Sequence, residues 1–336
     1  MSCEDAAFRT GFASARVLVT GGLGFIGSNL ALRLCELGAH VTLLDNLTPA
    51  HGGNRFNVAP IRERAACVIG DMRDEGLVRE LLAGQDYLFN LAGQTSHIDS
   101  MRDPVQDLEA NVRAHLVVLE ACRAVNPAVR TVFASTRQIY GKPEYLPVDE
   151  DHPLRPVDVN GIHKLAGEMY HRLYAQVYGL HTTVLRLTNT YGPRMRVKDD
   201  RQTFLGTWIR RLLCGEKLSV FGDGRQMRDF NHVDDVVRAM LLGALAREAG
   251  GNVYNLGSAD VLSLEELARK LIAIHGGGSY ELVGFPEDRK RIDIGDYFGS
   301  HDRISRDLGW QPRVGLDEGL RQTLAFFGRF GEHYWP

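Results

Sequence analysis

The stretch RVLVTGGLGFIG at residues 16–27 decides the fold of this chain. Arg16–Thr20 is a short apolar run, typical of a buried parallel strand, and four glycines follow it, at positions 21, 22, 24 and 27, where a strand turns into a helix. Gly21 permits the tight turn, Gly24 lets a diphosphate approach the backbone, and Gly27 lets the helix pack on the sheet. A bound anion would lie at the positive end of the helix dipole. The stretch therefore predicts the start of a dinucleotide-binding domain.

The second expected strand indicates which dinucleotide binds. It ends in Asp45, 18 residues after Gly27, where a carboxylate can bond the adenosine ribose hydroxyls. A 2′-phosphate would meet a negative charge there, so the position favours NAD. Asp71, in GDMRD at 70–74, follows the third expected strand and is placed to meet the adenine. Capping of the next helix is the alternative role for Asp71.

Strand-like and helix-like segments alternate from Arg16 to about residue 188. Six such units in series predict an α/β fold, a Rossmann-type doubly wound parallel sheet with helices on both faces. The expected strands are 16–20, 39–44, 66–69, 87–91, 131–134 and 182–187, and the expected helices are 25–37, 74–83, 105–125 and 159–178.

The pattern changes after residue 188, where proline, glycine and arginine become frequent and the segments become shorter. We expect an NAD-binding domain of residues 14–188 plus 232–258. A smaller α/β substrate lobe is expected from residues 189–231 plus 259–332.

Composition narrows the class of protein. The net charge of −3 gives no bulk electrostatic case for binding nucleic acid or an anionic membrane. The apolar runs are far too short to span a bilayer, and the first 15 residues lack the apolar core of a signal peptide. The five cysteines are scattered, and the twelve histidines show no metal-ligand spacing. These features predict a cytoplasmic protein with reduced thiols and without a metal.

Further motifs continue along the chain in the same order as in one known group of enzymes. The chain resembles the extended short-chain dehydrogenase/reductase superfamily, in particular its NAD-dependent nucleotide-sugar epimerase/dehydratase branch, from Arg16 to Phe326. The motifs are GGLGFIG at 21–27, DNLT at 45–48, GDMRD at 70–74, NLAGQTSHIDSMRDP at 90–104, FASTRQIYG at 133–141, HKLAGE at 163–168, LRLTNTYGPR at 185–194, VFGDGRQMRDFNHVDDVV at 220–237 and LGWQP at 308–312. The resemblance implies that NAD contacts Gly21, Gly24, Phe25, Ile26, Asp45, Asn46, Asp71, Met72, Leu91, Ala92 and Lys164.

The resemblance also implies a reaction and three catalytic positions. Enzymes of this branch oxidise a sugar hydroxyl with NAD, act on the keto-sugar and often return the hydride. A tyrosine four residues before a lysine removes the hydroxyl proton, and a Ser or Thr at the end of the preceding strand bonds the same hydroxyl. Here Thr136 and Lys164 fill two of the positions, but Asn160 stands where the tyrosine is expected. The spacing still puts Asn160 and Lys164 on one helical face.

An asparagine changes what the site can do. Its amide can orient a substrate oxygen but cannot accept a proton near neutral pH, and general-base catalysis contributes about 10²–10⁴-fold. His97 and His163 are candidates for a replacement base. His163 is adjacent to Lys164 and points about 100° away around the helix, so we favour His97, for which a loop-anchoring role is the alternative. Tyr140, in the IYG turn, is expected to pack.

The two residues after Thr136 bear on the type of reaction. Branch members that eliminate water carry Asp-Glu there and the decarboxylases carry Glu, whereas this chain has Arg137 and Gln138. Together with AGQ at 92–94, this polar pair is partly similar to the CDP-tyvelose (paratose) 2-epimerase group. We therefore expect an NAD-dependent nucleotide-sugar epimerase. The alternatives are a pseudoenzyme that binds both ligands, or an NAD-dependent dehydrogenase or dehydratase that uses another base.

Several residues match positions at which the branch holds a nucleotide-diphosphate sugar. Guanidinium groups suit bidentate contacts with a diphosphate, although each arginine alone would be a solvated surface charge. The expected substrate-binding residues are His97, Asn189 at the end of the sixth strand, Arg201, Phe221 near the base, Arg228 and Arg291. The resemblance also implies a homodimer through helices 105–125 and 159–178, whose apolar residues could otherwise be ordinary core.

Overall fold

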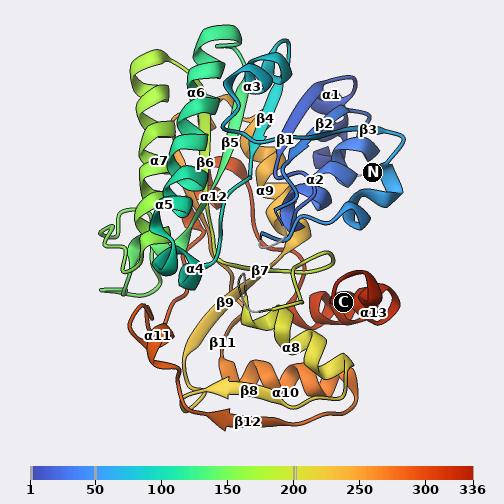
Figure 1. The fold of residues 1–336 in the computed structure, drawn as a ribbon, viewed down its shortest axis with the longest axis vertical. Coiled ribbons are helices and arrows are strands. Elements are labelled where there is room, and N and C mark those ends of the chain that lie inside the picture. Colours follow the sequence, from blue (N-terminus) through green and yellow to red (C-terminus); the bar gives the residue numbers. More distant parts are fainter. Residues whose placement is uncertain (1–2, 49–50, 200, 202, 336) are drawn as a thin grey trace.

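A seven-stranded parallel sheet forms one half of the molecule (Figure 1). The computed structural model describes residues 3–48, 51–199, 201 and 203–335. The strand order is β10-β6-β5-β4-β1-β2-β3. The strands are β1 (Arg16–Thr20), β2 (His40–Asp45), β3 (Ala65–Ile69), β4 (Tyr87–Asn90), β5 (Arg130–Thr136), β6 (His181–Leu187) and β10 (Val253–Leu256). The chain reverses its direction of travel across the sheet between β1 and β4, which opens a crevice at the carboxyl ends of these strands. The predicted Rossmann-type fold is confirmed.

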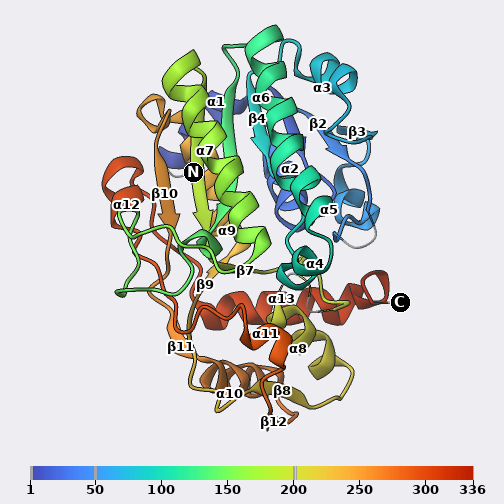
Figure 2. The ribbon, with the colours of Figure 1, turned by 60° about the vertical axis from the view of Figure 1, so that its left-hand side comes forward.

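Helices cover both faces of this sheet, as Figures 1 and 2 show. One core lies beneath α1 (Cys3–Phe12), α2 (Phe25–Glu36), α9 (Val233–Leu245) and α12 (Asp302–Leu308). The other face packs against α3 (Glu75–Leu82), α6 (Ala114–Val125) and α7 (Val159–Tyr178). The strands other than the edge strand β3 are largely buried from both sides, which explains why their sequences are continuous apolar runs rather than alternating ones. β3 leaves most of its residues exposed or partly exposed.

The expected helix at 105–125 is interrupted. It consists of α5 (Pro104–Leu108), a π-helical turn at Glu109–Arg113, and α6; α4 (His97–Arg102) precedes it. Asp103 caps α5 by accepting a hydrogen bond from the backbone N–H of Gln106. The wide turn carries the buried Asn111, which donates to the carbonyl of Gln94 at 2.9 Å. The interruption therefore ties this helix to the loop after β4.

A smaller lobe lies at the carboxyl end of the sheet (Figure 1). Its three-stranded sheet is β11 (Val261–Ser263), β9 (Met227–His232) and β7 (Asn189–Tyr191), and its two-stranded sheet is β12 (Tyr280–Val283) and β8 (Leu218–Phe221). The helices are α8 (Phe204–Leu213), α10 (Leu264–His275), α11 (Glu287–Lys290) and α13 (Leu316–Phe330). Asn189, predicted to end the sixth strand, instead begins β7, because the chain leaves β6 after Leu187 and crosses to the other lobe.

Two segments outside the boundaries predicted for the first domain pack on its core. Phe8 and Phe12 of α1 precede residue 14, and Ile304 and Trp310 lie within the predicted second lobe, yet all four are buried in the first core. Trp310 also donates its indole N–H to the carbonyl of Asp235 in α9 at 2.9 Å. The segment around α12 covers the edge strand β10, which would otherwise expose apolar side chains.

Candidate active site

The glycine-rich loop after β1 leaves open backbone at the start of α2. Gly21 has a φ of +67°, and a Cβ there would lie 2.9 Å from the Cα of Ala92. A Cβ on Gly27 would lie 2.3 Å from the carbonyl oxygen of Gly21. Gly24 is the N-cap residue of α2 and supplies no side-chain cap. Because Gly24 has no side chain that could cap the helix, the first backbone N–H groups of α2 can bind the oxygens of an anionic ligand.

Asp45 lies at the end of β2 beside this loop. Its Oδ2 accepts from the N–H of Leu23 at 3.0 Å and its Oδ1 from the N–H of Leu47 at 2.8 Å. Burial raises the pKa of Asp45 above the ordinary value, against these two backbone hydrogen bonds, which lower it. The carboxylate is thus fixed in position, and ribose hydroxyls would supply the further hydrogen bonds that a buried carboxylate needs.

Asp71 is held by a residue that sequence reasoning missed. Arg73 donates Nε to Oδ1 of Asp71 at 2.9 Å and Nη2 to Oδ2 at 2.7 Å. These hydrogen bonds, with a weaker opposing effect of burial, lower the pKa of Asp71 to about 2. Both residues line the same cavity as Asp45. The D-x-R spacing in GDMRD could have indicated this pair.

Thr136, Asn160 and Lys164 line the same cavity. Thr136 ends β5, and one helical turn of α7 separates Asn160 from Lys164. The ammonium of Lys164 donates to the carbonyl of Ala134 at 2.7 Å and lies 4.7 Å from the ring centroid of Phe133. Burial lowers the pKa of Lys164 to about 8, although the charges of two nearby carboxylates oppose the shift. At neutral pH the lysine is still a cation within the cavity.

Asn160 is anchored by its amide nitrogen. Nδ2 donates to the carbonyl of Gln94 at 2.9 Å and to Oδ2 of Asp107 at 3.2 Å. The backbone N–H of Asn160 donates to Oγ of Ser100 at 3.1 Å. Both partners of Nδ2 are acceptors, which fixes the orientation of the amide. Oδ1 is consequently the side-chain atom that can accept a hydrogen bond from a ligand.

Two neighbouring cavities meet at the junction of the lobes. All the predicted cofactor residues line the first cavity: Gly21, Gly24, Phe25, Ile26, Asp45, Asn46, Asp71, Met72, Leu91, Ala92 and Lys164. The second cavity is lined by Arg201, Phe221 and Arg228, among others. Four residues line both cavities: His97, Arg137, Asn189 and Thr203. A ligand in one cavity can therefore reach a ligand in the other at these residues.

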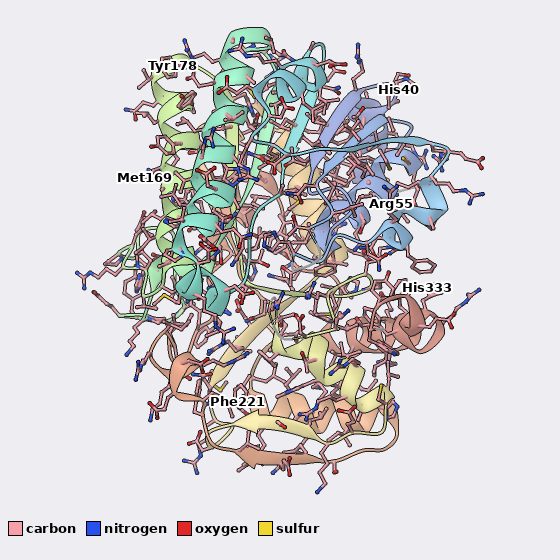
Figure 3. The ribbon with its side chains drawn as sticks, in the orientation of Figure 1. His40, Arg55, Met169, Tyr178, Phe221 and His333 are labelled. Atoms are coloured by element: carbon pink, nitrogen blue, oxygen red, sulfur yellow. The ribbon has the colours of Figure 1, made fainter. Side chains whose placement is uncertain are left out.

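The second cavity combines buried cationic groups with aromatic rings. Arg228 is buried and donates to the carbonyl of Met227 at 2.8 Å; burial, with the nearby charge of Arg137, lowers the pKa of Arg228 to about 10. Phe221, labelled in Figure 3, lies 5.7 Å from Phe285 between ring centroids. This arrangement can bind a phosphorylated group and a flat base together.

One of the predicted arginines lies elsewhere. Arg291 is exposed and lines neither cavity, whereas Arg289 lines the second cavity with its guanidinium carbon 5.6 Å from the ring centroid of Phe221. The segment forms the single turn α11, in which residues two apart point in different directions. In this structure the arginine of this segment that faces the cavity is therefore Arg289, not Arg291.

Arg137 and Asn189 connect the ends of β5 and β7. Nη2 of Arg137 donates to Oδ1 of Asn189 at 2.9 Å, and Nδ2 of Asn189 donates to the carbonyl of Asp229 at 2.9 Å. The Arg137 guanidinium also lies 5.3 Å from the ring centroid of Tyr297. In the sequence, Arg137 bore only on the type of reaction, as a member of a polar pair without a carboxylate; its contact with Asn189 was not predicted.

The fold and the site define a class of dinucleotide-dependent α/β enzymes with a second ligand site beside the cofactor site. The chain belongs to the NAD-dependent epimerase/dehydratase family, which matches residues 17–257. It is 33% identical over 327 residues to the UDP-glucose 4-epimerase of Mycolicibacterium smegmatis, covering 93% of this chain and 98% of that one.

Solved structures agree with this family. An epimerase from Methanothermobacter thermautotrophicus has a TM-score of 0.91 and 29% identity, and the match covers 98% of this chain and 97% of that one. The dTDP-glucose 4,6-dehydratase DesIV of Streptomyces venezuelae, solved with NAD bound, has a TM-score of 0.86 and 30% identity, with 95% and 98% covered. The cofactor is NAD, and the uncapped start of α2 with Asp45 beside it fits that molecule.

In the described ranges no three His, Cys, Asp or Glu side chains gather as a metal site would require. Among the helices of the described residues, none is both long and apolar enough to cross a membrane.

Proposed function

We propose that this chain is a nucleotide-sugar epimerase that acts through transient oxidation of a ring hydroxyl. The observation that carries the proposal is the meeting of the two cavities at His97, Arg137, Asn189 and Thr203. NAD bound in the first cavity supplies hydride acceptance and return. Thr136 and Oδ1 of Asn160 orient the sugar hydroxyl, Asn160 standing in place of the tyrosine usual in the family, and Lys164 holds the nicotinamide ribose.

The second cavity is assigned to the nucleotide diphosphate of the sugar. Arg228 and Arg201 supply positive charge for the diphosphate, and Phe221 supplies a face for the base. Asn189 and His97 lie where the diphosphate and the sugar approach the first cavity. The similar proteins described above include a UDP-glucose 4-epimerase and a dTDP-glucose 4,6-dehydratase. Both sugar nucleotides are compatible with a nucleotide diphosphate in the second cavity and a sugar at the first.

Epimerisation is favoured over elimination by the residues at the junction. None of the four residues that line both cavities is a carboxylate. Gln138, which lines the second cavity, has an amide that cannot act as an acid or base, and it donates to Asp158 at 2.8 Å. Loss of water or of a carboxyl group needs a proton donor or acceptor at the neighbouring carbon. Epimerisation needs only the return of the hydride to the other face of the keto-sugar.

The experiment is a panel of UDP-, dTDP-, CDP- and GDP-sugars incubated with the NAD-loaded protein and followed by ¹H NMR. An epimer formed without net NADH supports the proposal. Stoichiometric NADH or a dehydrated product would replace it by a net oxidation or an elimination that uses another base. Absence of any product, with both ligands binding, would favour a pseudoenzyme.

A second candidate, a pseudoenzyme that binds NAD and nucleotide sugar, is motivated by Asn160. The variant Asn160→Tyr separates it from the epimerase. A gain in turnover of about 10²-fold or more would indicate that the natural chain lacks proton transfer. A loss of turnover would indicate that the amide is part of a working site.

We also propose a homodimer through α6 and α7. The outward side of α7 exposes Met169, Leu173, Val177 and Tyr178, and Figure 3 shows Met169 and Tyr178 on the outside of the molecule. A row of large apolar side chains along one helix is typical of a surface that another chain covers. Leu119 of α6, by contrast, is buried in the core of the chain itself.

A further inference from the structure

His97 occupies a special position among the histidines of the described residues. It is the one that lines both cavities, at the start of α4 in the loop after β4. His51 lines the first cavity alone, and His163 lines neither. A group that exchanges a proton with the sugar has to lie where the sugar and the cofactor meet, and His97 satisfies this requirement.

A buried carboxylate lies against one ring nitrogen of His97. Nδ1 is 2.9 Å from Oδ2 of Asp158, and the carboxylate of Asp158 has no exposed surface. The approach is close but bent, since Nδ1 has no aligned hydrogen bond. Catalytic hydrogen bonds are often poorly aligned when no substrate is bound and tighten in the complex with substrate. Nδ1 is buried although about a third of the side chain is exposed, so Nε2 is the nitrogen presented to the cavity.

Asp158 is itself held rigidly. It caps α7 by accepting the N–H of Gly161 on Oδ1 at 2.6 Å, and Oδ2 accepts from the amide of Gln138 at 2.8 Å. Burial alone would raise the pKa of Asp158, but His97, Gly161 and Gln138 together outweigh burial and keep the pKa below the ordinary value. The residue is thus a fixed anion that favours a proton on Nδ1 of His97 and leaves Nε2 as an acceptor.

Three other polar residues that line the first cavity with His97, namely Asn160, Lys164 and Arg137, do not offer such an acceptor. The amide of Asn160 cannot take a proton, and its nitrogen is already engaged with Gln94 and Asp107. Lys164 has a pKa of about 8, so that at neutral pH the ammonium holds its protons, and it donates one to the carbonyl of Ala134. Arg137 is a permanent cation.

We propose that Nε2 of His97, oriented by Asp158, accepts the proton of the sugar hydroxyl in place of the missing tyrosine. This inference rests on the proposed function. The hydroxyl O–H bond breaks and its proton moves to Nε2, while the electron pair of that bond becomes the second carbon–oxygen bond. The hydrogen on the same carbon leaves with its own electron pair to the oxidised nicotinamide, the oxidant that the proposed function supplies. The reverse transfers restore the hydroxyl, and His97 ends neutral. Asp158 is a positioning residue.

The structure offers a matched control for His97. His163 forms a chemically similar pair, with Nδ1 2.7 Å from Oδ1 of Asp107, on the same helix that Asp158 caps. It lines neither cavity, and its side chain is only 13% exposed. Glutamine at either position keeps a donor for the paired carboxylate but cannot act as a base.

The first test compares His97→Gln with His163→Gln in the NAD-loaded protein, using the sugar nucleotide that the wild type converts fastest. We expect His97→Gln to lower kcat by about 10²–10⁴-fold. Calorimetric Kd values for NAD and the nucleotide sugar should stay within about threefold of the wild type, and His163→Gln should keep wild-type turnover. Turnover of His97→Gln within threefold of wild type would overturn the role of His97 and leave the epimerase proposal standing. A wild type without turnover on any sugar nucleotide would overturn both.

The second test observes the ring directly. ¹⁵N NMR of histidine-labelled holoprotein should show His97, assigned through His97→Gln, with its proton on Nδ1 and an unprotonated Nε2 at neutral pH. Asp158→Asn keeps an N-cap acceptor, and it should shift this tautomer and lower kcat about tenfold or more without a matching change in KM. An Nε2-protonated ring in the wild type, or a tautomer insensitive to Asp158→Asn, would overturn the proposal.

Discussion

Asn160 donates its side-chain amide to the carboxylate of Asp107 across 3.2 Å, and this contact joins α7 to α5 within the candidate active site. The other oxygen of Asp107 is 2.7 Å from Nδ1 of His163. Asn160 and Asp107 are both buried. An asparagine at this position therefore both shapes the loop after β4 and presents Oδ1 to a ligand.

The first prediction concerns Asn160→Asp. A carboxylate in this position would face Asp107 in a buried setting and lose both donated hydrogen bonds, so we expect a loss of roughly 2–4 kcal/mol of unfolding free energy. The two neighbouring carboxyl groups would bind a proton more tightly in the folded protein than in the unfolded chain. The loss of unfolding free energy should therefore grow as pH rises from about 5 to 8. Thermal unfolding across this range measures it. Asn160→Ala removes the donors without adding a charge, and a loss for Asn160→Asp that matched Asn160→Ala at every pH would contradict the prediction.

The second prediction concerns the cofactor. Asp45→Asn replaces the anion expected to bond the adenosine ribose, and hydrogen bonds to charged groups contribute about 1.5–3 kcal/mol. Calorimetry on cofactor-stripped protein should show NAD binding weakened by roughly 10- to 150-fold. The control is Asp74→Asn, which alters only the cap of α3 outside both cavities. Equal NAD affinity for Asp45→Asn and the wild type would remove Asp45 from the cofactor site.

The third prediction concerns the charge on Lys164. Its folded pKa of about 8 is below the ordinary value of 10.5, so the folded protein binds fewer protons than the unfolded chain between these pH values. The stability cost of burying the ammonium is fully present below pH 8 and is relieved as pH rises toward 10.5. The Tm of Lys164→Met minus the Tm of the wild type should therefore be larger at pH 7 than at pH 9.5. NAD affinity should fall in the variant. A Tm difference that did not change with pH would show that burial of the Lys164 ammonium does not destabilise the folded protein.

The fourth prediction concerns a buried ion pair beneath the site. Arg186 on β6 donates to both carboxylate oxygens of Glu168 on α7, at 3.1 and 2.6 Å, and Ser135 donates to the same carboxylate at 2.7 Å. Arg186→Leu leaves a buried anion and should cost about 3–5 kcal/mol. The double variant with Glu168→Leu should recover part of this loss in denaturant unfolding. Additive losses in the double variant would mean that the two charges do not stabilise each other.

The fifth prediction concerns assembly. Leu173→Glu together with Val177→Glu places two charges on the exposed side of α7, and a dimer that buries this surface should dissociate. Light scattering coupled to size-exclusion chromatography measures the change. Leu282→Glu is the control, because Leu282 is an equally exposed apolar residue on β12 in the other lobe. Dissociation in both the α7 double variant and the Leu282→Glu control, or in neither of them, would contradict an interface on α7.

Local sequence patterns predicted the first half of the fold closely. The glycine loop, Asp45 and the apolar runs each reflect a backbone or burial requirement within one strand–turn–helix unit. The i, i+4 spacing of Asn160 and Lys164 likewise sufficed to place them on one face of α7. The break in the helix at Glu109–Arg113 gave no such signal, and the contact of its Asn111 with Gln94 joins it to a segment far away in the sequence.

The sequence by itself thus determined the sheet, the cofactor loop and the identity of the residues at the end of β5 and the start of α7. Only the tertiary structure decided which distant groups meet: His97 with Asp158, Arg137 with Asn189, and Arg289 rather than Arg291 at the second cavity. The physical reason is that periodicity fixes the side of its own element on which a residue lies. Pairing between side chains tens of residues apart depends on strand order and on the path of the loops that connect the two lobes.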